Sequence, residues 1–230
     1  MDKIFFSVII PTLNAEKSLS LCINAIRAAQ GDVEIIVIDG GSEDQTVSIA
    51  TKENVMIGRS KAGRGVQLNS GATLASGDVF VFLHADTRLP ADAFRVLRNR
   101  FENPQVQIGT FAMRFDQHHW LLDFYARMTK VDSLWTSFGD QGIVTRKPFF
   151  HLLGGFPNWP LFEDVRFLQE ARKQTTVDTF PACVTTSADR FVRKGIFLNQ
   201  IKNGWLIAQY LMGIPPEILY QKYYSIRKNN

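Results

Sequence analysis

The sequence contains little cysteine and no long uninterrupted apolar run. Its two cysteines, Cys22 and Cys183, lie far apart and lack the spacing of metal ligands. Both stand in apolar surroundings, so we expect small core residues in a reducing compartment. No stretch approaches the ~20 apolar residues that span a bilayer. The N-terminus also lacks the apolar segment and small-residue cleavage site of a signal peptide, which together predict a cytoplasmic protein.

The sequence also lacks a strong charge imbalance. The formal net charge is +4, with no long Lys/Arg run and no basic stripe interleaved with aromatic residues. This balance permits anionic partners such as nucleoside diphosphates or acidic lipids, and we expect no nucleic-acid binding. With 230 residues, 45% hydrophobic and 21% charged, the chain is suited to one folded domain, alone or with a small appendage.

The first half of the sequence alternates short apolar strands with helices. The strands expected there are Ile4–Ile10, Val33–Ile38, Val55–Ile57 and Val79–Leu83. We expect Asn14 to cap the helix after the first strand, and Ser42 or Asp44 to cap the next helix. A basic, glycine-rich loop from Gly58 to Gly65 precedes a third helix. Strands apolar at nearly every position are typical of parallel sheets covered on both faces, so we predict an open α/β sheet with ligands at the carboxyl ends of its strands.

The second half of the sequence is less regular. After a helix that follows Pro90, the expected elements are the strand Val106–Phe115, the helix Trp120–Val131, the strand Gly142–Thr145 and the helix Phe162–Lys173. We therefore predict a domain over residues 1–187, with a nucleotide-binding half at about 1–105 and an acceptor half at 106–187. Residues 188–230 form a C-terminal helical extension.

The C-terminal extension is basic and amphipathic. Its first expected helix, Ile196–Met212, follows Arg190, Arg193 and Lys194. One face of this helix carries Ile201, Trp205, Ala208 and Met212. Such a helix either covers the acceptor half of the core or lies in a membrane interface beside a lipid-linked acceptor. Both alternatives stay open, and the first is the commoner arrangement in soluble folds.

Three acidic sites are predicted to gather at the strand ends, and the first is Asp39. It ends the second strand and precedes Gly40, Gly41 and Ser42. Glycines let the backbone turn tightly beside a ligand, and a strand-end carboxylate accepts hydrogen bonds from a ribose or base. Helix capping explains Ser42 and Asp44 equally well, but it does not explain Asp39.

The second site is His84-Ala85-Asp86, where the strand Val79–Leu83 stops. If the chain stays extended, His84 and Asp86 point to the same side and face one metal ion. Mg²⁺ or Mn²⁺ neutralises the charge that develops on a diphosphate leaving group. The alternative is that Asp86 caps the helix beyond Pro90 while His84 packs in the core. The strand end favours the functional interpretation.

The third site is Glu163-Asp164, at the start of the helix expected over Phe162–Lys173. Sugar transfer to a hydroxyl needs a base to remove the hydroxyl proton, and a carboxylate serves. The alternative is that the pair only stabilises the first helical turn through the macrodipole.

Three further polar residues, Arg64, Gln67 and Asn69, follow the glycine-rich loop. An arginine near a helix N-terminus suits a phosphate, and the two amides suit polar contacts with a ligand. Arg64 is equally explained as a solvated surface charge.

Taken in order, several segments resemble the family 2 glycosyltransferases with the GT-A fold. They are Ser7–Asn14, Ile38–Thr46, Gln67–Ala72, Phe82–Thr87, Gly139–Gly142, Gly154–Phe156 and Glu163–Asp164. The resemblance covers roughly residues 7–173, and the ordered set carries its specificity. It implies an α/β fold of GT-A type, an open, mixed and mostly parallel sheet flanked by helices, here with a C-terminal helical tail.

The resemblance also implies an activity and residue roles. Such enzymes transfer a sugar from a nucleoside-diphosphate sugar to an acceptor, here a hydroxyl, usually inverting the anomeric centre. Asp86, with His84, would hold a divalent metal, Mn²⁺ or Mg²⁺; Asp164 would be the general base, with Asp140 in reserve. The residues that would bind substrates are Pro11, Thr12, Asn14, Asp39, Gly41, Ser42, Arg64, Gln67, Asn69, His84, Ala85, Gln141 and Glu163.

The sequence departs from the family pattern at two positions. Gly40 replaces the second of the usual paired aspartates, which removes one polar contact to the nucleoside. His84 replaces the first acid of the D-x-D motif, and a neutral imidazole suits Mn²⁺ better than Mg²⁺. The segment Leu83–Thr87 reads L-H-A-D-T and is similar to a small bacterial subgroup of these transferases.

Other function classes compete with this one. A non-catalytic nucleotide-sugar-binding protein of the same fold is the main rival, because Gly40 and His84 weaken two motifs. A nucleotidyltransferase or a nicotinamide dehydrogenase would carry a glycine-rich loop after the first strand, where this chain has Pro11–Asn14. We therefore expect a cytoplasmic enzyme, at the inner face of the membrane if its acceptor is lipid-linked.

Overall fold

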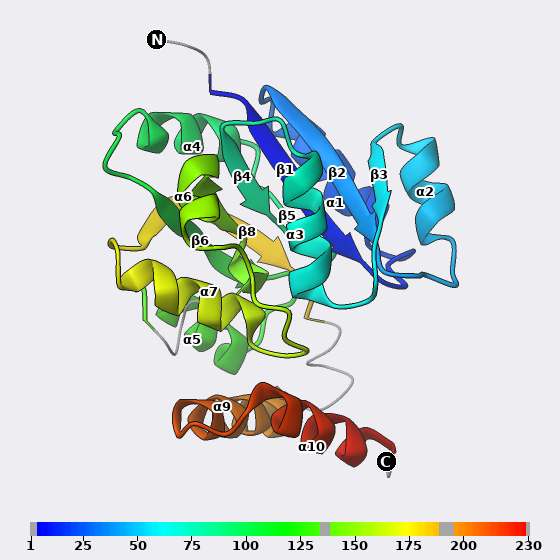
Figure 1. Cartoon of the computed structure of the whole chain (residues 1–230), viewed down its shortest axis with the longest axis vertical. Coiled ribbons are helices and arrows are strands. Elements are labelled where there is room, and N and C mark those ends of the chain that lie inside the picture. The colour runs from blue at the N-terminus through cyan, green and yellow to red at the C-terminus, as the bar shows by residue number, and fades with distance from the viewer. Residues whose placement is uncertain (1–3, 134–138, 189–195, 229–230) are drawn as a thin grey trace.

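The computed structural model describes residues 4–133, 139–188 and 196–228 and builds them around one mixed sheet (Figure 1). The strands are β1 (Phe6–Thr12), β2 (Val33–Asp39), β3 (Met56–Arg59), β4 (Val79–Phe82), β5 (Thr87–Arg88), β6 (Ile108–Phe115), β7 (Ile143–Arg146) and β8 (Asp178–Thr186). The helices are α1 (Leu19–Ala28), α2 (Thr46–Lys52), α3 (Arg64–Leu74), α4 (Ala93–Phe101), α5 (Trp120–Met128), α6 (Lys147–Leu152), α7 (Glu163–Arg172), α9 (Ile196–Leu211) and α10 (Pro216–Lys228), with a 3-10 turn, η1 (Gly139–Gln141). Among the described residues the strand order is β3-β2-β1-β4-β7-β6-β8-β5.

The first four strands are parallel, as the sequence predicts. Phe6 of β1 lies opposite Val33 of β2 on one side and Val79 of β4 on the other. Every residue of β1 and of β4 is buried, because helices cover both faces of the sheet. The carboxyl ends of β1 and β2 meet where Thr12 lies opposite Asp39. Polar residues just beyond these strands are therefore brought together at one edge.

The second half of the sheet is antiparallel where it joins the first. β7 pairs antiparallel with both β4 and β6, whereas β8 pairs parallel with β6. The sequence analysis missed β8, which contains Pro181, and β5, which has only two residues and pairs with β8. β5 is stabilised by its pairing with the longer strand β8. The residues of β5 themselves carry no local signal that predicts a strand.

The sheet separates two apolar layers. One lies under α1, α4 and α5 and includes Leu19, Phe94 and Leu122; the other lies under α3, α6 and α7 and includes Leu68 and Phe167. Cys22 is in the first layer, where burial raises the pKa of its thiol above the ordinary value, with a further rise from the Asp86 charge. Cys183 is half-buried, and neither cysteine is in a disulfide.

The caps predicted at Asn14 and Ser42 are wrong, because these residues bond to other loops. α1 begins at Leu19, and Asn14 instead lies in the left-handed region (φ 53°), with Oδ1 accepting from Glu43 N at 2.9 Å. Ser42 Oγ accepts from Asn14 N at 2.9 Å. α2 begins at Thr46, whose N–H donates to Asp44 Oδ1 at 2.9 Å, so the other predicted residue, Asp44, does hold the start of this helix. The contacts of Asn14 and Ser42 tie the loops after β1 and β2 to each other.

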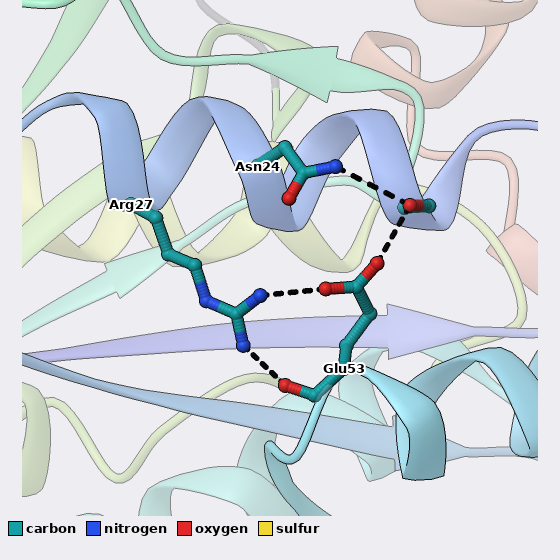
Figure 2. A network of polar contacts seen from close by, with 4 residues as sticks. Asn24, Arg27 and Glu53 are labelled. Carbon is teal, nitrogen blue, oxygen red and sulfur yellow. Dashed lines mark hydrogen bonds and ion pairs between the residues drawn. The ribbon is translucent and has the colours of Figure 1, made fainter.

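A polar network fixes α1 to the end of α2 (Figure 2). Glu53 accepts from Ser20 Oγ at 2.7 Å and from Arg27 Nη1 at 2.6 Å, while the backbone carbonyl of Glu53 accepts from Arg27 Nη2. Asn24 donates to Ser20 Oγ at 3.4 Å. The Ser20 hydrogen bond is the main cause of the lowered pKa of Glu53, so this carboxylate stays ionised and holds the loop at the end of α2.

The C-terminal extension forms two helices, α9 and α10, that lie beside α7 at one end of the molecule (Figure 1). Ile207 and Leu219 pack against Phe162 and Val165 in a small separate core. The Pro215-Pro216 pair does not end the helical structure, because Pro216 begins α10, where its missing N–H costs nothing. In the part of the chain that the structure describes, no helix has the length and apolar character to cross a membrane.

Candidate active site

The loop after β2 is shaped by Asp39. This buried carboxylate accepts from Gly41 N at 3.0 Å and from Ser42 N at 3.1 Å. Gly41 has φ 97°, a conformation that favours glycine and allows both N–H groups to point back at the carboxylate. Asp39 was predicted to bind substrate. In the structure its carboxylate stabilises the loop that follows β2. Beside it, Thr12 is buried and donates through Oγ1 to Ile38 O at 3.3 Å.

Gln67 occupies the space beside Gly40. Its Nε2 donates to Thr12 O and to Ile38 O, each at 2.8 Å, and joins the ends of β1 and β2. A Cβ on Gly40 would lie 3.1 Å from Gln67 Cδ. The glycine that departs from the family pattern therefore makes room for a buried amide that bonds to the backbone.

Asn69 joins α3 to the turn around Gly155. Its Nδ2 donates to Phe156 O at 2.8 Å, and its Oδ1 accepts from Phe156 N at 2.9 Å. Both ends of the amide therefore bond to backbone groups of one residue. Like Gln67, Asn69 was predicted to contact substrate, and in the structure it connects segments that surround the candidate site.

The chain turns sharply after β4, so the expected extended geometry at His84-Ala85-Asp86 is wrong. Thr87 N donates to His84 O at 3.0 Å and closes the turn. Pairing of β5 with β8 forces this turn, because the chain must reverse to enter the far edge of the sheet. Asp86 does not cap the next helix either, since α4 begins at Ala93. Ala85 is buried between the two half-buried polar residues.

The candidate metal ligands are His84 and Asp86, which follow the end of β4. Among the described residues, no group of three or more His, Cys, Asp or Glu side chains is arranged to hold a metal ion. Mg²⁺, however, is usually bound by one or two carboxylates together with substrate phosphates. An imidazole and a carboxylate are donor types that suit an ion sharing its coordination with a diphosphate, and the described residues offer no site built from protein ligands alone.

Asp164 is held in place at the start of α7. Its Oδ2 accepts from Gly139 N at 2.7 Å and its Oδ1 accepts from Val165 N at 2.8 Å. The residue is only 9% exposed. The macrodipole role requires neither this burial nor the bond to Gly139, whereas the bond to Val165 N, in the first turn of α7, is a contact that the helix-stabilising alternative predicts.

Two predicted site residues, Asp164 and His84, both approach Gly139. A Cβ on Gly139 would lie 3.0 Å from Asp164 Oδ2 and 3.3 Å from His84 Nε2. The side chain from the end of β4 and the one from the start of α7 thus approach the same backbone position of η1. The β4–β7 pairing brings the end of β4 beside η1, and the Gly139–Asp164 hydrogen bond brings the start of α7 to the same turn.

Glu163 forms an ion pair with Arg64, across the boundary between α7 and α3. Arg64 Nε lies 2.7 Å from Glu163 Oε1, and the Glu163 side chain is 2% exposed. The other carboxylate oxygen, Oε2, is buried without a hydrogen-bond partner among the described residues. Burial raises the pKa of Glu163 to about 7, the Arg64 charge opposes this rise, and the Asp164 charge adds to it. Arg64 is thus engaged with a carboxylate and is not simply a solvated charge.

η1 carries Asp140 and Gln141, and Gln141 is fully buried. The sequence analysis missed Tyr125 of α5, which lies near this turn. Burial raises the pKa of the Tyr125 hydroxyl well above its ordinary value, and the charges of Asp140 and Asp164 raise it further. No motif marks Tyr125, since its position depends on the packing of α5 against β6. The remaining predicted residue, Pro11, is buried within β1.

Known proteins share sequence and fold with this chain. Residues 7–154 match the family model described as Glycosyl transferase family 2. The PGL/p-HBAD biosynthesis glycosyltransferase of Mycobacterium bovis is 41% identical over 93 residues, which are 36% of this chain and 36% of that protein. The match thus covers little more than a third of the length of this relative.

Solved structures share the fold at low identity. A mannosyltransferase from Pyrobaculum calidifontis, in complex with GDP-Man and Mn²⁺, has a TM-score of 0.66 at 18% identity, covering 96% of this chain and 70% of that one. S. aureus TarS 1-349, in complex with UDP-GlcNAc, has a TM-score of 0.62 at 20% identity, covering 80% and 58%. The sheet and its flanking helices therefore have the GT-A architecture that the sequence motifs predict.

Proposed function

The chain belongs to glycosyl transferase family 2, and from this premise we propose that it transfers a sugar from a nucleoside-diphosphate sugar to a hydroxyl acceptor. One observation carries the proposal: Asp164 and His84 both approach Gly139, so that a candidate base faces the strand end where a diphosphate would lie. The donors named with the TarS and Pyrobaculum structures, UDP-GlcNAc and GDP-Man, support this donor class.

Asp164 is the proposed general base. It accepts the proton of the acceptor hydroxyl while the hydroxyl oxygen attacks the anomeric carbon and the bond from that carbon to the diphosphate oxygen breaks. A single displacement of this kind inverts the anomeric centre. The two backbone N–H groups that bond to the carboxylate orient it without protonating it. Asp140, on η1 beside Gly139, is the reserve candidate.

The donor site is proposed at the ends of β1, β2 and β4. The loops of Pro11–Asn14 and Asp39–Ser42, tied together by the Asn14–Ser42 contact, would hold the nucleoside. Gln67 and Asn69 keep the surrounding backbone in place, and Arg64 lies at the N-terminus of α3. The division into a nucleotide-binding half, an acceptor half and a tail remains part of this proposal.

A divalent ion is proposed to accompany the donor, held by Asp86 with His84 as the second ligand. When bound, such an ion supplies charge neutralisation for the departing diphosphate. Mn²⁺ in the Pyrobaculum structure supports this choice, and an imidazole ligand favours Mn²⁺ over Mg²⁺. We propose that the L-H-A-D-T sequence marks a subgroup with this ligand set, and that it works in the cytoplasm.

The test is a donor panel. The melting temperature of the protein is measured with UDP-, GDP-, ADP- and dTDP-sugars, with and without Mn²⁺, because a ligand that binds the native state raises it by mass action. Release of nucleoside diphosphate is then followed for each donor that binds. Absence of any shift contradicts the donor site. A shift without turnover, with every acceptor class tried, favours a non-catalytic binding protein.

A further inference from the structure

The outer face of α5 carries exposed apolar side chains in a row. Trp120, Phe124 and Met128 are 73%, 59% and 44% exposed, and they recur every four residues, which places them on one side of the helix. The other side packs inward through Leu122 and Ala126. Single exposed apolar residues are ordinary, but a row that continues over the whole helix indicates an interaction surface.

The outer face of α9 repeats this pattern at the same end of the molecule (Figure 1). Trp205 is 61% exposed and Met212 is 66% exposed, whereas Ile207 of the same helix is buried. Trp205 and Met212 belong to the apolar face predicted from the sequence, and both point away from the core. A different face of α9, which includes Ile207, packs on α7. α5 and α9 are in contact with each other, so both rows belong to one region. We call the five exposed apolar residues of α5, of α9 and of the position just after α9 the apolar end surface: Trp120, Phe124, Met128, Trp205 and Met212.

Basic side chains are exposed on the same elements. Arg127 and Lys130 lie on or just after α5, Lys202 lies on α9 and Lys222 on α10, and all four are exposed. The exposed acid on these elements, among the described residues, is Glu217. The region is therefore apolar and net basic, and its charge is complementary to an anionic surface.

A bilayer surface fits this combination better than a second copy of the chain. Tryptophan places an apolar body and a polar N–H at the headgroup level, and lysine extends its charge to lipid phosphates. Protein–protein interfaces are depleted in lysine at their cores, and three of the four cations here, Lys130, Lys202 and Lys222, are lysines. A second copy would also bring the same positive charge against itself.

The apolar end surface lies beside the acceptor side of the candidate site. Tyr125, on the other side of α5, is near Asp140 and Asp164. Tyr210 of α9 packs on Phe162 with ring centroids 5.0 Å apart, immediately before Glu163 and Asp164. Tyr210 of α9 thus contacts the segment that leads into the candidate base, and the Asp164 charge acts on Tyr125 of α5.

We propose that the outer faces of α5 and α9 dock on an anionic lipid bilayer and that the acceptor hydroxyl is presented from that bilayer. The docking part stands on the surface alone, whereas the acceptor part rests on the proposed function. In the docked protein the start of α7, which carries Asp164, lies close to the membrane. A lipid-anchored hydroxyl can then reach Asp164 without leaving the interface.

Sedimentation with lipid vesicles tests the docking. The full chain is mixed with phosphatidylcholine vesicles, with and without phosphatidylglycerol, and the bound fraction is measured at low and high salt. We expect binding to the anionic vesicles that weakens with salt, because the surface charges are screened. The double substitution Trp120→Ala, Phe124→Ala should weaken binding by at least about tenfold, because it removes two large apolar side chains that the interface would bury.

Matched variants separate docking from folding. Leu152→Ala removes a side chain that is 73% exposed on α6, outside the apolar end surface, and should leave binding unchanged. Arg127→Glu with Lys130→Glu should lose binding to anionic vesicles while the melting temperature stays close to that of the parent. Equal binding to neutral and anionic vesicles would overturn the charge argument, as would equal losses in the Leu152 variant and the aromatic variant.

Self-association is the competing outcome. If light scattering shows a dimer that Trp120→Ala, Phe124→Ala converts to a monomer, and vesicles are not bound, the surface is a protein interface and the proposal is wrong. Donor-induced thermal shifts measured on the same samples distinguish the two proposals. Vesicle binding without donor shifts contradicts the proposed function and leaves the docking in place, whereas donor shifts without vesicle binding contradict the docking alone.

Discussion

Gly139 N donates to Asp164 Oδ2 at 2.7 Å, and this hydrogen bond joins η1 to the start of α7. A Cβ on Gly139 would lie 3.0 Å from the same oxygen, so the contact depends on the absence of a side chain there. The other oxygen, Oδ1, accepts from Val165 N. The carboxylate is thus anchored at both oxygens within a buried turn, and its orientation is set before any substrate arrives.

Substitution of Asp164 by Asn should abolish turnover and leave donor binding intact. The amide cannot accept the hydroxyl proton, and loss of a general base lowers kcat by roughly 10²–10⁴-fold. The measurement pairs nucleoside-diphosphate release with the donor-induced thermal shift. Asp140→Asn is the matched control on η1. If it removes turnover while Asp164→Asn retains it, the two roles must be exchanged.

Substitution of Asp86 by Ala should remove the part of the donor-induced thermal shift that depends on Mn²⁺. Asp86 and His84 are the two proposed ligands, and no group of three or more such side chains is arranged for a metal among the described residues, so loss of the carboxylate should leave too few ligands for the ion. His84→Asp should instead shift the preference from Mn²⁺ toward Mg²⁺, because a carboxylate suits the harder ion. A Mn²⁺ effect of unchanged size in Asp86→Ala would place the ion elsewhere.

Glu163 should make the stability of the protein depend on pH. Its pKa of about 7 in the folded protein exceeds its ordinary value of 4.5, so the fold favours the protonated carboxyl. The free energy of unfolding should therefore be highest below about pH 4.5 with respect to this group and should decline as the pH rises through about 7. The decline is on the order of 3 kcal/mol at most, at 1.36 kcal/mol per pKa unit.

Urea unfolding at a series of pH values measures this dependence. Glu163→Gln should remove the decline between these pH values, whereas Glu102→Gln, an exposed position, should preserve it. Arg64→Met should extend the decline to higher pH, because the Arg64 charge opposes the rise in the pKa of Glu163. An identical pH profile in the parent and in Glu163→Gln would contradict the assignment.

Gly65→Ala should destabilise the junction of α3 with the loop before α7. A Cβ there would lie 2.3 Å from Pro157 O, a backbone atom, and 3.4 Å from Glu163 Cβ. Overpacking of this kind costs about 1–3 kcal/mol. Gly204→Ala is the control, since a Cβ on this residue of α9 meets nothing within 4 Å. That change should be neutral or should stabilise by up to about 1 kcal/mol through helix propensity. Thermal unfolding measures the stability of both variants. Equal changes in stability for Gly65→Ala and Gly204→Ala would contradict the predicted clash.

The strands that the sequence predicts well are those with a clear local run of apolar residues. β1, β2 and β4 are apolar at nearly every position and buried on both faces, so their composition is sufficient evidence for a parallel sheet. β5 and β8 are different, because their pairing joins residues about a hundred positions apart. No window of sequence contains both partners. The turn at His84-Ala85-Asp86 depends on this pairing, so the sequence left the extended chain there as a condition, which the structure does not meet.

The sequence by itself determined the identity and order of the candidate chemical groups: a carboxylate after β2, a histidine and a carboxylate after β4, and an acidic pair at the start of α7. Only the tertiary structure decided how those groups are used. It engages the Asp39 carboxylate and the Gln67 amide with the backbone, pairs Glu163 with Arg64 and brings His84 to Gly139 and Asp164. It also turned the Trp205 face of α9 outward. The physical reason is that burial and hydrogen-bond partners come from segments distant in the chain, whereas residue order and periodicity are local properties.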